Sequence, residues 1–352
     1  MKKNGLTLLL AGLILTVGCA PARQTETRRL PDFPVEPVNY WQVKVTDNFW
    51  APRMETNRLV TIPYLFHMNE ESGRVDNFRI AAGLKTGKHT GKRYNDSDVY
   101  KAIEAAAYTL KTNPDPELKK QIDELVDLIR QAQEPDGYLF TARTIDPKNP
   151  APGSGQERWS NLRVSHELYN LGHLYEAAVA YYQATGEKNL LDLATRSADL
   201  LVKTFGPDKR RAFPGHQEVE IGLVKLYRVT GREDYLKLAK FFLDERGHYH
   251  GGEVFPESSP FYIYNSEEYL QNHRPVLEQT EAVGHAVRAS YMYSAMLEVA
   301  ALGSWPEYAR ASTNLWENVV NKKLYLTGGI GSTGEYEAFG ADYELPNEQA
   351  YA

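Results

Sequence analysis

The sequence of 352 residues is poor in cysteine and has no surplus of positive charge. A single cysteine cannot form an internal disulfide, which excludes a small scaffold held together by disulfides. The chain has 40 lysines and arginines against 46 aspartates and glutamates, and its net charge of −6 leaves no basic excess to neutralise phosphates. Nucleic acid is therefore not an expected partner. Charged residues at 24% and hydrophobic residues at 42% are typical of a globular protein.

The apolar run near the N-terminus, Gly5 to Gly18, is only 14 residues long and follows a basic start. Such a run is too short to span a bilayer and is typical of a signal-peptide core. It ends in TVGC, which resembles a bacterial lipoprotein cleavage box with threonine where leucine is usual. We therefore expect a signal peptide at 1–18, a lipidated Cys19 and a polar tether at 19–38. The protein would be exported to the periplasm or outer membrane, with the lipid as its only membrane contact; a plain signal peptide or an uncleaved anchor is the alternative.

From Tyr40 onward, apolar residues recur at helical spacing in pairs of segments. One segment of each pair is apolar on nearly all sides and the next has one apolar face. The pairs are 99–110 with 117–132, 166–182 with 190–202, 217–227 with 235–243, and 281–302 with 308–320.

A helix that is apolar all round must be enclosed by other helices, whereas a helix with one apolar face covers the outside. The pattern therefore predicts an all-α fold, an α/α barrel (toroid) of inner and outer helices. An open helical-repeat array is the alternative, but the uneven spacing of the breaking glycines argues against it. We expect loops and short strands at 39–60, 204–216 and 244–276.

Three histidines have equivalent places at the starts of the expected inner helices: His166, His216 and His285. Because inner helices of a regularly alternating barrel run parallel, the sequence predicts that the three imidazoles meet in one central pocket. The N-terminus of a helix favours neutral histidine, which suits hydrogen bonding to hydroxyls. Three unrelated structural histidines would show the same spacing. His173, further along the same segment as His166, is expected to pack in the barrel wall.

A glycine-rich stretch at 326–347 follows the last expected helix and carries Glu335, Glu337, Asp342 and Glu344. Glycines let the backbone approach a ligand closely. No lysine follows them, so this is not a phosphate-binding loop. Carboxylates crowded at a pocket would raise one another's pKa, as a general acid requires. The alternative is a solvated acidic loop.

Several motifs together resemble those of glycoside hydrolase family 127, the β-L-arabinofuranosidase-like enzymes of bacterial glycan degradation. In family order, the shared stretches are NFWAPR at 48–53, DSDVYK at 96–101, PDGY at 135–138, HELY at 166–169, GHQE at 215–218, and the segments 281–288 and 328–347. The resemblance runs from about residue 40 to the end and depends on no single motif.

The resemblance implies a glycosidase that removes terminal L-arabinofuranose-like sugars from glycans by a retaining mechanism. It assigns Glu337 the role of general acid/base and makes His166, His216 and His285 contacts to the sugar. The partner is then a glycan or an oligosaccharide.

The resemblance also implies a cysteine nucleophile held as a thiolate by zinc, with further cysteine ligands. Cys19 is the only cysteine of this chain, so neither the nucleophile nor the zinc ligands are present, and no metal site or cofactor is expected here. Residues 39–352 are accordingly expected to be the N-terminal part of the family's catalytic barrel, incomplete at the C-terminus and inactive as a fragment.

Two other functions stay open. One is an α/α-barrel sugar epimerase or lyase that uses histidine and carboxylate without a metal. The other is a surface glycan-binding lipoprotein without catalysis.

Overall fold

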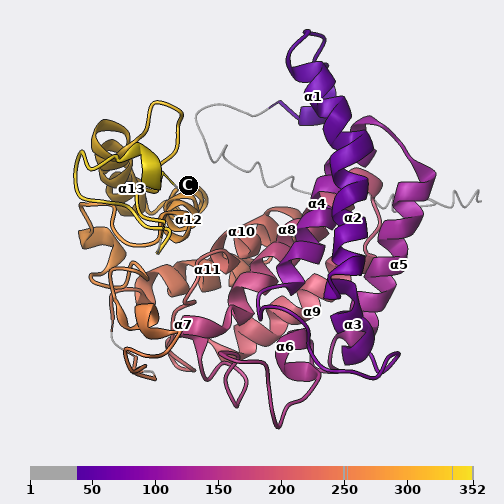
Figure 1. Ribbon diagram of the computed structural model, residues 1–352, viewed down its shortest axis with the longest axis horizontal. Helices are drawn as coiled ribbons and strands as arrows, with labels where there is room; N and C mark the ends of the chain where they lie inside the picture. Colours follow the sequence, from indigo (N-terminus) through magenta and orange to yellow (C-terminus); the bar gives the residue numbers. More distant parts are fainter. Residues whose placement is uncertain (1–37, 249, 252, 335, 351–352) are drawn as a thin grey trace, which may run out of the picture. The chain divides into compact units, whose positions relative to one another are not determined.

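Pairs of antiparallel helices repeat along the computed structural model, which describes residues 38–248, 250–251, 253–334 and 336–350 (Figure 1). The pairs are α2 (Ile62–Glu71) with α3 (Arg74–Ala81), α4 (Asp96–Thr112) with α5 (Pro116–Ala132), α8 (Glu167–Thr185) with α9 (Asn189–Thr204), α10 (Val219–Thr230) with α11 (Glu233–Glu245), and α12 (Ala286–Gly303) with α13 (Pro306–Asn318). The shorter helices are α1 (Trp50–Thr56), α6 (Thr141–Thr144) and α7 (Leu162–Ser165), and the 3-10 and π turns are η1 (Tyr40–Gln42), η2 (Asn57–Thr61), η3 (Tyr262–Asn265), η4 (Val276–Glu278), η5 (Val319–Lys323) and η6 (Asn347–Gln349).

The paired helices form two layers, as the sequence predicts. Helices α4, α8, α10 and α12 pack side by side in chain order, and α5, α9, α11 and α13 cover them from outside. The extensive helix contacts within the described residues follow the chain and do not join α12 to α2. The prediction of an all-α fold with inner and outer helices is confirmed.

Local sequence signals fix the helix ends. Asp115 caps α5, because its Oδ1 accepts the backbone N–H groups of Glu117 and Leu118 at 3.1 Å each. Pro116 occupies the first turn, where a missing N–H costs nothing. Gly186 and Gly231 end α8 and α10 in the left-handed conformation.

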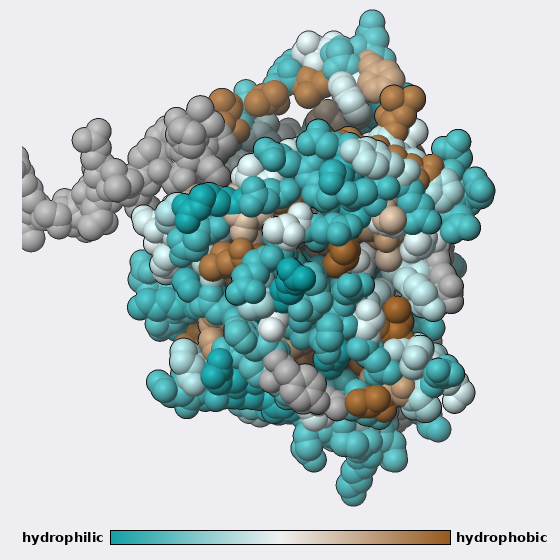
Figure 2. All heavy atoms as spheres, turned by 90° about the vertical axis from the view of Figure 1, so that its left-hand side faces the viewer, coloured by the Kyte–Doolittle hydropathy of each residue, from teal (hydrophilic) through white to brown (hydrophobic). Residues whose placement is uncertain are grey.

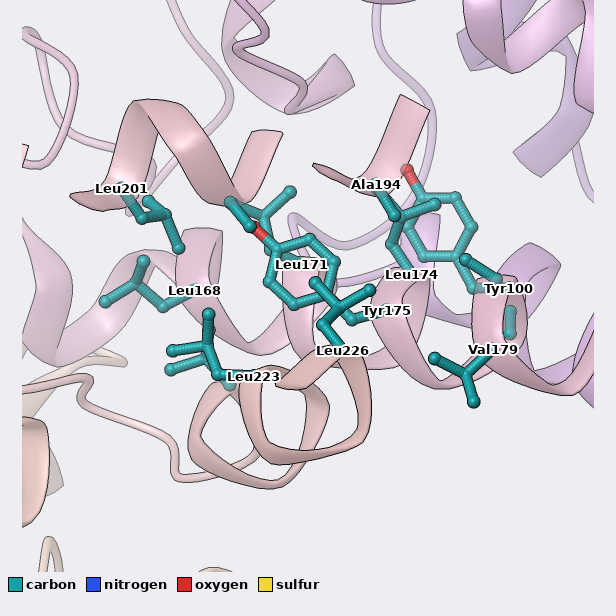
Figure 3. Close-up of a cluster of buried hydrophobic side chains, with 14 of the residues drawn as sticks. Tyr100, Leu168, Leu171, Leu174, Tyr175, Val179, Ala194, Leu201, Leu223 and Leu226 are labelled. Carbon is teal, nitrogen blue, oxygen red and sulfur yellow. The ribbon is translucent and has the colours of Figure 1, made fainter. Parts of the chain in front are cut away.

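Buried leucines of α8 and α10 meet in one hydrophobic cluster, in which Figure 3 shows Leu168 of α8 near Leu223 of α10. The two backbones approach closely because each helix has a glycine at the crossing. A Cβ on Gly222 would lie 2.6 Å from the carbonyl oxygen of Gly172. Any larger side chain would push the helices apart.

Two expectations for local structure are wrong. Residues 50–60, at the end of the range 39–60 in which loops and short strands were expected, are helical instead, in α1 and η2. Phe49 and Trp50 are exposed at the end of the molecule that carries α1 in Figure 1, where Figure 2 also shows apolar residues at the surface, so no buried stripe marks this helix. The described residues contain isolated β-bridges but no strand.

The last inner helix also starts later than expected, at Ala286 rather than Glu281. Gly284 adopts a positive φ of 70°, and a Cβ there would lie 2.0 Å from the carbonyl oxygen of Glu268. The amide of His285 donates to Tyr269 O, and the carbonyl of Gly284 accepts from Phe339 N. Residues 281–285 therefore pair with two loops instead of continuing the helix.

The expected signal peptide and Cys19, with all of the tether but residue 38, lie outside the described residues. Among the described helices, none combines the length and apolar character needed to cross a bilayer.

Candidate active site

The starts of three inner helices bring the three predicted histidines together. His166 is the N-cap of α8, His216 lies just before α10, and His285 is the N-cap of α12. The ring centroids are 5.4 Å apart for His166 and His216 and 5.6 Å apart for His216 and His285. All three side chains are buried. The geometry thus shows the expected convergence, while the role of these rings in binding a sugar stays a prediction.

Glu337 joins this histidine cluster from the glycine-rich stretch. Its Oε2 lies 3.0 Å from Nε2 of His285, and its side chain keeps 42% of its exposure to solvent. The backbone holds it in place, because Glu337 O accepts from the amide of Ala286 and Ala338 forms a bridge with His285. The carboxylate therefore stands at the edge of the cluster, in contact with both protein and solvent.

Two of the other carboxylates of this stretch, Asp342 and Glu344, have partners of their own. Asp342 pairs with Lys322 at 2.7 Å, and Glu344 accepts from the backbone of Ala341 at 2.8 Å. Glu335 lies outside the described residues. The hydrogen bond from Lys322 lowers the pKa of Asp342, contrary to the expectation that crowding raises it.

Hydrogen bonds fix the tautomer of each ring. His166 Nδ1 lies 2.7 Å from Val164 O, and His216 Nδ1 lies 2.8 Å from Gln217 O, so both Nδ1 atoms carry the proton. Each ring then presents an unprotonated Nε2 as an acceptor. His285 is reversed, because its Nδ1 accepts from the amide of Arg288, and its Nε2–H donates to Glu337.

All three histidines are neutral. Burial lowers the pKa of His166 and His216 well below the ordinary value, and the guanidinium of Arg288 lowers both further. Burial, with Arg288 second, lowers the pKa of His285 to about 3. At neutral pH the cluster therefore offers two acceptors and one donor with no imidazolium charge.

Two residues of the cluster have strained backbones. His166 has a φ of 61° and Glu337 a φ of 53°, in the left-handed region that side chains other than glycine rarely occupy. Such conformations persist where the surrounding structure holds a side chain in one direction, and they concentrate at functional sites.

Sequence reasoning missed the aromatic and arginine residues around the cluster. The ring centroid of Tyr94 lies 5.0 Å from that of His166, the centroid of Tyr169 lies 4.4 Å from that of His216, and the centroid of Tyr269 lies 5.5 Å from that of His285. Arg288 is buried, donates to the carbonyl of Gly215 and faces the ring of Tyr269. Tyr94 could have been found, because it precedes α4 as the histidines precede or cap their helices; Tyr169 lies one turn after His166.

His173 lies in the wall between α8 and α10, as expected. Together with Glu176 and Glu218 it forms the group of three potential metal ligands found among the described residues, with ligand atoms within 4.8 Å of one another. None of these three belongs to the histidine cluster.

Comparisons with known proteins point to one family. The family model of the β-L-arabinofuranosidase GH127 catalytic domain matches residues 42–352. A non-reducing end β-L-arabinofuranosidase of Bifidobacterium longum subsp. longum is 37% identical over 341 residues, which cover 88% of this chain and 51% of that protein. The chain thus spans about half the length of this relative.

Solved structures are similar over the same extent. A GH127 β-arabinofuranosidase matches with a TM-score of 0.85 and 49% identity, over 92% of this chain and 49% of the other. A GH127 β-L-arabinofuranosidase from Geobacillus stearothermophilus T6 matches with a TM-score of 0.81 and 43% identity, over 88% and 50%. These structures are α/α barrels, which confirms the predicted fold.

Proposed function

The chain belongs to glycoside hydrolase family 127, the β-L-arabinofuranosidase family, and from this premise we propose that it carries the sugar-binding and acid/base residues of a glycosidase. The substrate class is a glycan that ends in an L-arabinofuranose-like sugar at its non-reducing end. The names of the B. longum and G. stearothermophilus relatives support this substrate class.

The observation that carries the proposal is the contact between His285 and Glu337 beside two further neutral imidazoles. Sugar hydroxyls donate to the unprotonated Nε2 atoms of His166 and His216. The Nε2–H of His285 orients the carboxyl group of Glu337. Glu337 first protonates the departing glycosidic oxygen and then accepts a proton from water, as the acid/base of a retaining glycosidase does.

The zinc-held thiolate that the family resemblance implies does not fit the residues of this chain. Such a site needs cysteine ligands, and residues 20–352 contain none. No step is therefore assigned to a metal here. We propose that the 352-residue chain binds the sugar and does not release it from a glycoside.

Calorimetry tests the binding residues. Methyl β-L-arabinofuranoside should bind the chain, and His216→Asn should weaken binding by about tenfold or more, because a buried hydrogen-bond partner of the sugar is lost. His67→Asn, at a side chain that is 58% exposed on α2, is the matched control and should bind as the wild type does. Failure of the folded wild-type chain to bind would refute the proposal.

A charged analogue tests Glu337. An iminosugar of arabinofuranose shape should bind the wild type about tenfold or more tightly than Glu337→Gln, because its ring ammonium pairs with the carboxylate. The neutral glycoside should bind both proteins alike. Equal binding of the iminosugar would place Glu337 away from the reacting carbon. Release of arabinose by the chain alone would refute its inactivity, and an unsaturated product would identify a lyase.

We also propose that the protein is exported and anchored through a lipid on Cys19. The basic start, the apolar run and the TVGC sequence support this. Labelling with a radioactive fatty acid in a bacterial host should mark the wild type and not Cys19→Ser. Equal labelling of both proteins would refute the anchor.

A further inference from the structure

A second cluster of polar side chains lies between α8 and α10, beneath Tyr169. The ring of His173 is one turn further along α8, with its centroid 4.6 Å from that of Tyr169. Glu176 follows on α8, and Glu218 is the N-cap of α10. The side chains of His173, Glu176 and Glu218 are 4%, 12% and 0% exposed, so the cluster is closed off from solvent.

Two members of this cluster lack hydrogen-bond partners. Among the described residues, neither ring nitrogen of His173 and neither side-chain oxygen of Glu218 has a partner. Buried polar groups are nearly always satisfied by protein, water or an ion. Glu218 in particular is a fully buried carboxyl group that points at an imidazole without bonding to it.

The spacing in the cluster is that of ligands around one ion. His173 Nδ1 lies 3.5 Å from Glu176 Oε2 and 3.5 Å from Glu218 Oε1. A direct hydrogen bond would be shorter by about half an ångström. Two ligand atoms bound tetrahedrally to a zinc-sized ion at about 2.05 Å are separated by about 3.4 Å.

We propose that His173, Glu176 and Glu218 bind a divalent transition-metal ion of the zinc class. One imidazole nitrogen and two carboxylate oxygens form a ligand set that such ions accept. No thiolate takes part, and no member of the histidine cluster is used.

The charges around the cluster favour a cation. The ammonium of Lys225 donates to Oε1 of Glu176 and lies 3.8 Å from Glu104, which leaves Oε2 of Glu176 facing His173. Lys101 is bound to the hydroxyl of Tyr169. Three carboxyl groups, those of Glu104, Glu176 and Glu218, and two ammonium groups surround the cluster, and burial, with Glu176 beside it, raises the pKa of Glu218 well above its usual range. A divalent ion that binds here takes the place of the proton that Glu218 otherwise holds, and it occupies the unpartnered ligand atoms.

Titration of Zn²⁺ into the EDTA-treated 352-residue chain tests the site. One equivalent should bind, and His173→Asn and Glu218→Gln should each weaken binding by about tenfold or more. His285→Asn removes a histidine from the neighbouring cluster and should leave the zinc affinity unchanged. Lys225→Met removes the competing ammonium and should tighten binding.

Co²⁺ provides a readout that is independent of affinity. The wild-type chain with Co²⁺ should show the intense visible absorption of a tetrahedral site, and Glu218→Gln should lose it while circular dichroism shows that the variant is folded. Binding of neither ion to the folded wild type would overturn the proposal. So would an unchanged affinity in Glu218→Gln, or loss of zinc in His285→Asn, which would move the ion to the other histidines.

Discussion

Lowering the pH from 7 to 5 should destabilise this protein, and His285 should account for a measurable part of the loss. Its pKa is about 3 in the folded chain because the ring is buried and lies near Arg288, whereas an unfolded chain restores a value of 6.5. A histidine with a lowered folded pKa stabilises the fold above pH 6.5, and this contribution declines as the pH falls toward the folded pKa. Between pH 7 and 5 the imidazole of His285 binds a proton in the unfolded chain but stays unprotonated in the folded chain. Integration of this difference gives about 2 kcal/mol for His285 alone.

Urea unfolding at the two pH values measures this contribution. Replacing His285 with asparagine removes the titrating ring, so the free energy of unfolding should fall by about 2 kcal/mol less than in the wild type over the same interval. Glu337→Gln in the same assay measures how much of the pH dependence comes from the carboxyl group that contacts His285. His67→Asn, on an exposed side chain, should keep the wild-type dependence. An identical fall in wild type and His285→Asn would mean that the folded chain accepts the proton, and would refute the neutral histidine cluster.

Two further changes test the fold. Gly222→Ala should lower the free energy of unfolding by about 1–3 kcal/mol, because its Cβ would lie 2.6 Å from the Gly172 carbonyl oxygen. Denaturant unfolding measures the loss, and a midpoint equal to that of the wild type would show that α8 and α10 can move apart without cost. Asp115→Ala should cost about 1 kcal/mol, because its Oδ1 caps two amides of α5, whereas Asp115→Asn should recover most of that loss in the same thermal melts.

The sequence was sufficient to predict the paired helices because burial leaves a periodic trace. In α8 apolar residues occur on nearly all sides, and in α5 they recur three and four positions apart. Helix α1 was missed because it buries no residue, and apolar side chains such as Trp50 are exposed and leave no such trace. The start of α12 depends on Gly284 pressed against Glu268, a contact between distant segments that a local pattern does not contain.

The candidate site was predictable to the same extent. The histidines stand at equivalent places in a repeated pattern, so their meeting follows from the helix order. The charged groups around the cluster could not be predicted in this way. Lys322, which takes up Asp342, and Arg288, which is buried under the histidines, come into place only through tertiary packing.

The tautomers of His166 and His216 set a rule for which molecules the cluster accepts. The one N–H group of each ring already donates a hydrogen bond to a backbone carbonyl. A ligand must therefore supply O–H groups that donate to both Nε2 atoms. A sugar that is methylated or acetylated at those hydroxyls has no proton to donate. Its oxygen lone pairs would face the lone pairs of the Nε2 atoms, and both nitrogens would lack a hydrogen bond. Sites that hydrogen-bond a hydroxyl discriminate strongly against analogues without it. If the cluster binds a sugar as proposed, methylation or acetylation of those hydroxyls would therefore prevent its binding.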